Sequence, residues 1–282
     1  MNGSHAQPTV VVGVDGSVAA LHAALWAVDE AVSRDIPMCL VHVLDSEGPE
    51  LDGAARKLAA AESAVHNVAA AVQATGKPVK LEVDIRPGRA TSTLIHASRG
   101  AAMVCLGAVG SNHFQPGRIG STAAAVALSA HCPVAIVRRH HALTRPHADW
   151  ILADADESPA DGVVVDTAVR EARRRAAPLR VITCWQPPGV DPEAAADCDR
   201  LIRARLDRRL ARWRHRYPDL HAEAVAVHGS ISDYLATHAA ELQLLVVGAR
   251  GAGHLREVVG PAGNAALGNS DSVVLVVDHQ HL

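Results

Sequence analysis

Aromatic residues are scarce in this 282-residue chain, since Phe, Trp and Tyr together make up 2%. A buried core must therefore be built from aliphatic side chains, which agrees with an apolar fraction of 49%. The chain also lacks an apolar run of the roughly 18 residues that a membrane span needs, and its first residues, MNGSHAQP, lack the apolar segment of a signal peptide. We predict a cytoplasmic protein with no membrane partner.

The cysteines, the histidines and the net charge exclude further classes of protein. The five cysteines are odd in number and include no Cys-x-x-Cys pair, so we interpret them as small buried hydrophobic residues, with a redox role as the minor alternative. The 17 histidines are scattered, without the spacing of a metal site. The net charge is −3, with no basic excess in either half. We predict no metal site and no nucleic-acid partner.

What the chain does contain is an internal repeat. VVGVDGS near the start returns in altered form as ILADADES, and VCLGAVG returns as LVVGARG. Asp15 and Asp156 lie 141 positions apart, as do Gly107 and Gly248. A period of this length is typical of two tandem domains rather than of a solenoid.

Each half alternates apolar, strand-like runs with segments of helical periodicity, which indicates parallel strands joined by right-handed crossovers. In the first half, the predicted strands are Thr9–Val14, Met38–Leu44, Val79–Ile85, Ala102–Leu106 and Pro133–Val137. We predict two tandem doubly wound, Rossmann-like α/β domains over residues 1–140 and 149–282. Each is expected to be a roughly five-stranded parallel sheet with helices on both faces.

The loop after the fourth predicted strand carries a phosphate-binding pattern. Gly107 and Gly110 are followed by nine residues and then by Gly120, Ser121 and Thr122, which open a helix. Glycines let backbone N–H groups approach phosphate oxygens, and a helix N-terminus adds oriented donors. The pattern is neither a Walker A loop nor a dinucleotide fingerprint. For any single glycine, a tight turn is the alternative explanation.

This spacing resembles the ATP-binding branch of the universal stress protein family. The resemblance extends to VGVDGS, LVHVLD and CPVAIV, and it covers both halves, as in the tandem form of mycobacteria and their relatives. It implies domains of the HUP type and a stress or dormancy regulator that binds ATP, or else ADP or AMP, with Mg²⁺ beside the phosphates left open. It also implies a homodimer or an intramolecular pseudo-dimer, paired through the last strand of each domain, and an unidentified protein partner.

The resemblance assigns one set of residues to the base. Gly13, Val14 and Asp15 would line the adenine pocket, and Val43 would offer its backbone to the edge of the base. For Asp15, capping of the following helix is the alternative role.

It assigns a second set to the ribose and phosphates: Gly107, Gly110, Gly120, Ser121 and Thr122. Val109 fills a slot where many relatives have Arg or His, so one charged phosphate contact is missing. Arg118 is a candidate to replace it. Preference for a triphosphate over ADP or AMP stays open.

The second copy has diverged at the same places. Eight residues rather than nine precede Gly260, and the next residue, Pro261, has neither an N–H nor a hydroxyl. Asp154 and Trp185 take the places of the first copy's glycine and valine on the base side. We predict that this domain binds ATP weakly or not at all. The alternative is that Arg250 and a rearranged loop still hold an anion.

The second half also contains an arginine-rich segment. Eight arginines lie between Arg200 and Arg216, on a segment whose apolar residues keep helical spacing. We interpret the arginines as a solvated face, and an acidic partner is the alternative.

Three functions are compatible with these patterns. The leading one is a nucleotide-binding regulatory protein, because no general base, nucleophile or pair of metal-binding carboxylates converges on the loop by motif. We therefore expect no catalytic residues. A slow ATPase or phosphotransferase is the second function, and a nucleotide-independent scaffold protein is the third.

The sequence alone yields one mutational prediction. Gly107→Asp or Ser121→Ala should weaken ATP binding without unfolding the protein, as measured by calorimetry. Unchanged affinity in both variants would count against the loop.

Overall fold

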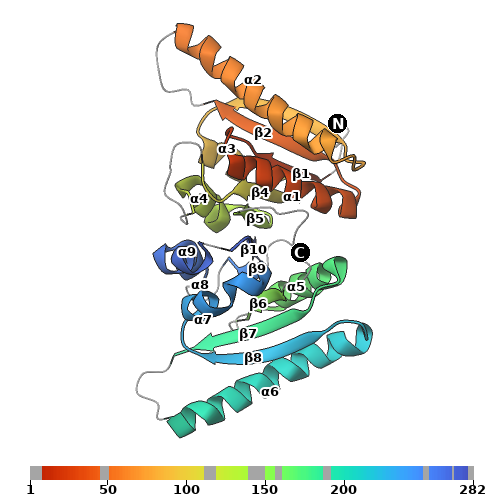
Figure 1. Ribbon diagram of the computed structural model, residues 1–282, viewed down its shortest axis with the longest axis vertical. Helices are drawn as coiled ribbons and strands as arrows, with labels where there is room; N and C mark the ends of the chain where they lie inside the picture. Colours follow the sequence, from red (N-terminus) through yellow and green to blue (C-terminus); the bar gives the residue numbers. More distant parts are fainter. Residues whose placement is uncertain are drawn as a thin grey trace, which may run out of the picture. The chain divides into compact units, whose positions relative to one another are not determined.

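The computed structural model describes residues 8–44, 51–110, 119–138, 150–155, 161–186, 192–249, 254–268 and 270–278. The chain separates into two compact units, Met1–His140 and His141–Leu282 (Figure 1). Within the described residues, every helix is too short or too polar to cross a membrane.

The N-terminal unit contains a parallel sheet with helices between its strands. The strands are β1 (Thr9–Gly13), β2 (Met38–Leu44), β3 (Leu81–Pro87), β4 (Ala101–Gly107) and β5 (Val134–Val137). The helices are α1 (Val18–Arg34), α2 (Leu51–Ala74), α3 (Ala90–Ala97) and α4 (Ser121–Ser129). The strand order is β3-β2-β1-β4-β5, and all neighbouring strands run parallel.

This strand order confirms the doubly wound prediction. The chain first winds from β1 outward to β3 and then crosses back over β1 to reach β4 and β5. Because the crossovers are right-handed, the reversal places α1 and α2 on one face of the sheet and α3 and α4 on the other. The contacts between α1 and α2 and between α3 and α4 agree with this. The switch in winding direction falls between β1 and β4.

The C-terminal unit repeats the arrangement. Its strands are β6 (Trp150–Asp154), β7 (Leu179–Trp185), β8 (Ala222–His228), β9 (Leu242–Gly248) and β10 (Val273–Val277). Its helices are α5 (Asp161–Arg175), α6 (Pro192–Arg216), α7 (Ile231–His238), the short 3-10 helix η1 (Ala239–Glu241), α8 (His254–Val259) and α9 (Pro261–Leu267). The order β8-β7-β6-β9-β10 is again parallel. The predicted pairing of β5 and β10 edge to edge stays a prediction.

The repeat extends to backbone details. Asp35 and Ala176 both have left-handed φ angles, 52° and 49°, and they lie 141 positions apart. Gly88 and Gly229, also 141 apart, have φ angles of 139° and 138°, which only glycine adopts readily. The two copies therefore keep the turns that the fold needs.

The core is aliphatic, as the composition predicts, and Cys105, Cys132 and Cys184 are buried within it. Burial raises the pKa of Cys132 to about 12, so its thiol is protonated and unreactive at neutral pH. One expected pattern is wrong. The alternation predicted a half-buried third strand, but no residue of β3 is buried and Val83 is 53% exposed, because β3 ends the strand order of its unit.

The arginine-rich helix α6 packs on the sheet through its apolar face, where Leu210 is 1% exposed. Several of its arginines have partners within the unit. Arg209 Nη1 lies 3.0 Å from Oδ2 of the buried Asp161, and Arg214 donates two hydrogen bonds to the Ala222 carbonyl. These contacts favour a role of the arginines in the fold over the acidic-partner alternative.

Helices α1 and α5 each bury a glutamate that an arginine four residues later reaches. Arg34 Nη2 lies 3.1 Å from Glu30 Oε2, and Arg175 Nε lies 3.2 Å from Glu171 Oε2. Glu30 is 0% exposed and Glu171 3%. A buried carboxylate is costly unless it is paired, so each pair is a structural requirement that both copies retain.

We expect Arg34→Ala to lower the free energy of unfolding by about 1–3 kcal/mol, because it removes a cation from a carboxylate that stays buried. Adding Glu30→Gln should recover part of the loss, since the buried charge is then gone. Denaturant unfolding measures both effects, with the exposed Arg203→Ala on α6 as the control. Equal stability of Arg34→Ala and the unmodified chain would contradict this account.

Candidate functional site

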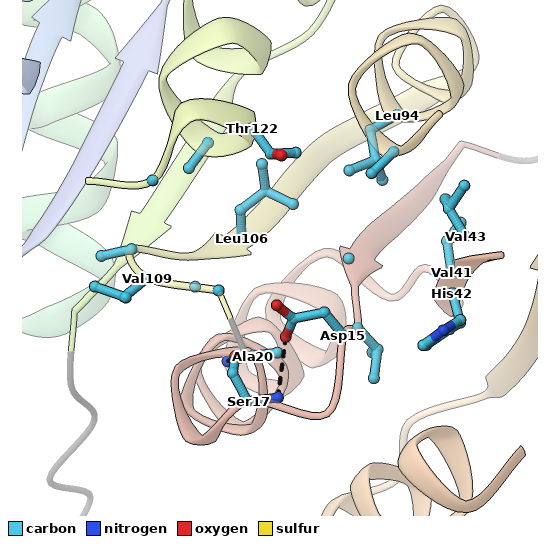
Figure 2. A pocket seen from close by; sticks show the side chains of 18 of the residues that line it. Asp15, Ser17, Ala20, Val41, His42, Val43, Leu94, Leu106, Val109 and Thr122 are labelled. Atoms are coloured by element: carbon cyan, nitrogen blue, oxygen red, sulfur yellow. Dashed lines mark hydrogen bonds between the residues drawn. The ribbon is translucent and has the colours of Figure 1, made fainter. Parts of the chain in front are cut away.

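A cavity of about 440 Å³ lies at the carboxyl ends of β1, β2 and β4 in the N-terminal unit (Figure 2). This is the edge where the winding of the sheet reverses, the usual place for a ligand in a doubly wound domain. The cavity brings together every residue that the sequence predicts for the site: Gly13, Val14, Asp15, Val43, Gly107, Gly110, Gly120, Ser121 and Thr122.

Asp15 lies in the turn between β1 and α1. Its Oδ1 accepts a hydrogen bond of 3.0 Å from Ser17 N, drawn as a dashed line in Figure 2. Ser17 itself caps α1, because its side chain accepts from Ala20 N at 3.1 Å. The capping role considered for Asp15 thus belongs to Ser17. The second carboxylate oxygen of Asp15 faces the glycine loop, since a Cβ added to Gly110 would lie 2.9 Å from it.

Gly107 ends β4 where the strand meets α1. A Cβ at this position would lie 2.5 Å from the carbonyl carbon of Ala19 and 2.7 Å from Ala20 N. Both atoms are backbone and cannot move aside without displacing the helix. Gly107→Asp would therefore disturb the fold as well as the cavity, so the expectation that it weakens binding without unfolding the protein is wrong.

The N-terminus of α4 opens on the opposite side of the cavity. Gly120 is its N-cap and offers no side chain to the first turn. Its own N–H donates to the Ala108 carbonyl at 2.7 Å, which fastens the helix start to the end of β4. The first bond within the helix is from Ala124 N, so among the residues that the structure describes the three preceding N–H groups are available to a ligand. Such a group of donors suits an anion.

Asp15 is the one charged side chain among the described residues that line the cavity. Val109 also lines the cavity, and its apolar side chain brings no positive charge to the glycine loop. Arg118, the candidate to supply that charge, lies outside the described residues. Sequence reasoning missed His42, which stands beside Val43 on β2 and lines the part of the cavity predicted for the base. Burial lowers the pKa of His42 despite the nearby Asp15 carboxylate, so the ring is neutral at pH 7.

In the C-terminal unit, the corresponding helix start is covered. Helix α8, which the sequence did not predict, packs directly against the first turn of α9. Gly260 N donates to the Glu257 carbonyl at 3.2 Å, and Asn264 Nδ2 donates to the Val259 carbonyl at 2.8 Å. A Cβ at Gly263 would collide with the backbone of Val258. Backbone carbonyls thus occupy the position where the N-terminal unit offers free donors.

The base side of the C-terminal unit is occupied as well. Asp154, in the place of Gly13, is 4% exposed, and its Oδ2 lies 2.8 Å from His254 Nδ1 at the start of α8. Cys184, not Trp185, stands in the place of Val43, because Gly229 N donates to the Trp185 carbonyl as Gly88 N donates to that of Leu44. The predicted replacement of Val43 by Trp185 is therefore wrong by one position. Trp185 Nε1 donates to Asp199 Oδ1 at 2.7 Å. Asp156 and Arg250, two other residues singled out from the sequence, lie outside the described residues.

The fold and the cavity define the N-terminal unit as a doubly wound α/β domain with a ligand-sized site at its switch point. Comparison with known proteins identifies the family. The sequence model of the universal stress protein family matches residues 8–138 and 149–278. The chain therefore belongs to the universal stress protein family.

Individual relatives agree with this. Universal stress protein Rv2028c of Mycobacterium tuberculosis (strain ATCC 25618 / H37Rv) is 48% identical over 100% of both chains. The crystal structure of a universal stress protein from Archaeoglobus fulgidus DSM 4304 has a TM-score of 0.72 at 18% identity and covers 98% of both chains. A universal stress protein solved in complex with cAMP matches 48% of this chain and 99% of its own, with 23% identity and a TM-score of 0.39.

Gly120→Asp should separate binding from folding. The backbone at Gly120 is ordinary, with φ −64°, and the nearest atom to an added Cβ lies 3.6 Å away. Aspartate is a better N-cap than glycine, so stability should stay equal or rise by a few tenths of a kcal/mol. The new carboxylate would repel an anionic ligand, and affinity for ATP or AMP should fall by about tenfold or more in calorimetry.

The control is Gly120→Asn, which has nearly the same shape without the charge. It should lower affinity clearly less than Gly120→Asp does. Equal losses in the two variants would mean that bulk rather than charge acts here, and no loss in either would place the anion elsewhere.

Proposed function

We propose that this protein binds an adenine nucleotide in the cavity of its N-terminal unit and acts as a nucleotide-dependent regulator in stress or dormancy. The observation that carries the proposal is the convergence of the glycine loop, the uncapped N-terminus of α4 and the Asp15 turn on one cavity. These elements come from three separate parts of the chain. Their meeting at the switch point is what a nucleotide site in this fold requires.

The geometry suggests an orientation for the ligand. The N–H groups of the first turn of α4 and the glycine loop suit the phosphates, because they are backbone donors at a helix N-terminus. The opposite end of the cavity is lined by Val41, Val43 and Leu94, whose apolar side chains suit the faces of a base. Asp15 lies between these ends, where a carboxylate can accept hydrogen bonds from a base amino group or ribose hydroxyls.

ATP, ADP and AMP are all candidates, because the resemblance points to ATP whereas the absence of a cation at Val109 leaves the preference open. Within the described residues, no group of three or more His, Cys, Asp or Glu side chains is placed to hold a metal ion. A companion Mg²⁺ would therefore be held mainly by phosphate oxygens and water, as Mg²⁺ often is at nucleotide sites.

We propose binding rather than catalysis as the activity. Among the described residues of the cavity, Asp15 is the one carboxylate, and it already accepts from Ser17 N. His42 is the one imidazole there, and it lies on the base side rather than at α4. Neither arrangement aligns a base with an attacking water at the phosphates. Hydrolysis of ATP that is lost in Gly120→Asp would favour the slow ATPase instead.

We propose further that the C-terminal unit binds no nucleotide. Helix α8 covers the first turn of α9, and Asp154 adds a buried carboxylate on the base side. An incoming nucleotide would have to displace the helix and approach that negative charge. The unit would then serve folding and assembly, including the predicted pairing through the last strands.

Isothermal titration calorimetry of the full chain with ATP, ADP, AMP and cAMP tests the proposal. We expect a stoichiometry of one nucleotide per chain, and mass spectrometry of the denatured protein should identify any copurified nucleotide. Two nucleotides per chain would contradict the closure of the C-terminal unit. Absence of binding for all four ligands would favour the nucleotide-independent scaffold.

A further inference from the structure

Helix α3 begins at the end of the cavity that suits a base. Gly88 and Ala90, on either side of the helix start, both line the cavity, and so does Leu94 one turn later. Figure 2 shows Leu94 and Val43 at the same end of the cavity. The start of the helix is attached to the end of β2, because Gly88 N donates to the Leu44 carbonyl at 2.9 Å. The first turn of α3 is therefore part of the cavity wall.

The backbone donors of this first turn are unfilled. The N-cap residue, Arg89, accepts no hydrogen bond from the turn through its side chain, and arginine is not among the residues that cap helices well. The first bond within the helix runs from Thr93 N to the Arg89 carbonyl at 3.0 Å. Within the described part of the chain, the N–H groups of Ala90, Thr91 and Ser92 thus have no acceptor.

In the C-terminal unit, an acceptor occupies the equivalent place. Helix α7 corresponds to α3, and Ser232 stands 141 positions after Thr91. Ser232 N donates to Glu257 Oε1 at 2.9 Å. Glu257 belongs to α8, the helix that covers the edge of this unit. Where the chain itself fills the edge, it therefore brings an oxygen acceptor to the first turn of this helix.

The two N-cap residues differ in the same sense. Ser230 stands 141 positions after Arg89, and its Oγ accepts from Asp233 N at 3.0 Å. The C-terminal unit thus satisfies two donors of the turn with groups of its own. The N-terminal unit leaves the corresponding donors on the wall of an open cavity, where a ligand can reach them.

We propose that the start of α3 recognises the base, by donating a backbone hydrogen bond to a ring nitrogen of the bound nucleotide. This inference rests on the proposed function and adds an element that determines specificity. Adenine accepts hydrogen bonds at its ring nitrogens N1, N3 and N7. The side chains beside the donors are those of Val43 and Leu94, which are apolar. Such surroundings suit a neutral ring nitrogen better than a second phosphate, whose charge would be costly to bury there.

Arg89→Asn tests the proposal by supplying the missing cap. Asparagine is among the best N-cap residues, and its side-chain oxygen accepts from the second or third N–H of a helix, here Thr91 N or Ser92 N. It competes with the ligand, so affinity for the tightest binder among ATP, ADP and AMP should fall by about fivefold in calorimetry, as expected for one lost hydrogen bond. The melting temperature should rise, because the helix gains a cap.

The matched control is Arg89→Gln. It removes the same positive charge and adds the same amide group, but glutamine is not a preferred N-cap residue. Its affinity should therefore stay above that of Arg89→Asn. Thr91→Pro deletes one N–H in the first turn, where proline is tolerated, and it replaces Arg89→Asn if that variant melts below the unmodified chain.

Deaza analogues of the same nucleotide identify the atom. The 1-deaza, 3-deaza and 7-deaza forms each replace one ring nitrogen by C–H. One of them should bind the unmodified chain about fivefold more weakly than the parent nucleotide does. This penalty should largely disappear in Arg89→Asn, because the cap has already taken the donor, whereas independent effects would add.

Three results would each overturn the inference while leaving the proposed function intact. They are equal affinity of Arg89→Asn and Arg89→Gln, equal binding of the parent nucleotide and all three analogues, and an analogue penalty that is the same in Arg89→Asn as in the unmodified chain. Failure of the unmodified chain to bind ATP, ADP or AMP would instead refute the proposed function.

Discussion

The cavity depends on how closely the end of β4 approaches the first turn of α1. No side chain fits between them, because a Cβ at Gly107 would lie 2.5–2.8 Å from atoms of Ala19 and Ala20. This contact brings the glycine loop to the Asp15 turn, and the bond from Gly120 N to the Ala108 carbonyl then fixes the start of α4 beside both. The site is therefore a product of backbone packing, and its donors are oriented before a ligand arrives.

In the C-terminal unit, groups of the chain itself occupy the corresponding edge of the sheet. Helix α9 begins with Pro261, which has no N–H to offer. The N–H of Gly260 and the side-chain amide of Asn264 both donate to carbonyls of α8. Asp154 stands in the place of a glycine, and its Oδ2 lies 2.8 Å from His254 Nδ1. The same fold thus accommodates an open edge and a closed one.

Much of this could be predicted from the sequence, because strand periodicity and loop spacing are local signals. The spacing from Gly107 to Thr122 identified residues that all line one cavity. The low burial of β3 was not predictable from its alternation, since exposure depends on the position of the strand in the sheet. Helix α8 was missed because it is short and its stability comes from packing against α7 and α9. His42 was missed because its place in the cavity follows from the pairing of β1 with β2, for which the chain gives no local pattern.

A comparison of the two copies distinguishes the residues that the fold requires from those at the proposed binding site. The left-handed turn at Asp35 and Ala176, the glycines at 88 and 229, and the buried glutamates all recur at a spacing of 141. None of the three sits at the start of the helix after the fourth strand. Beyond that edge the spacing between equivalent residues changes from 141 to 140, since Gly107 pairs with Val137 and Gly248 with Val277. A loop there can lose a residue and gain a helix without altering the sheet, because its ends are already fixed by the strands. Under the proposed function, loss of the ligand site would therefore be a local event that leaves the turns and the buried pairs shared by the two copies in place.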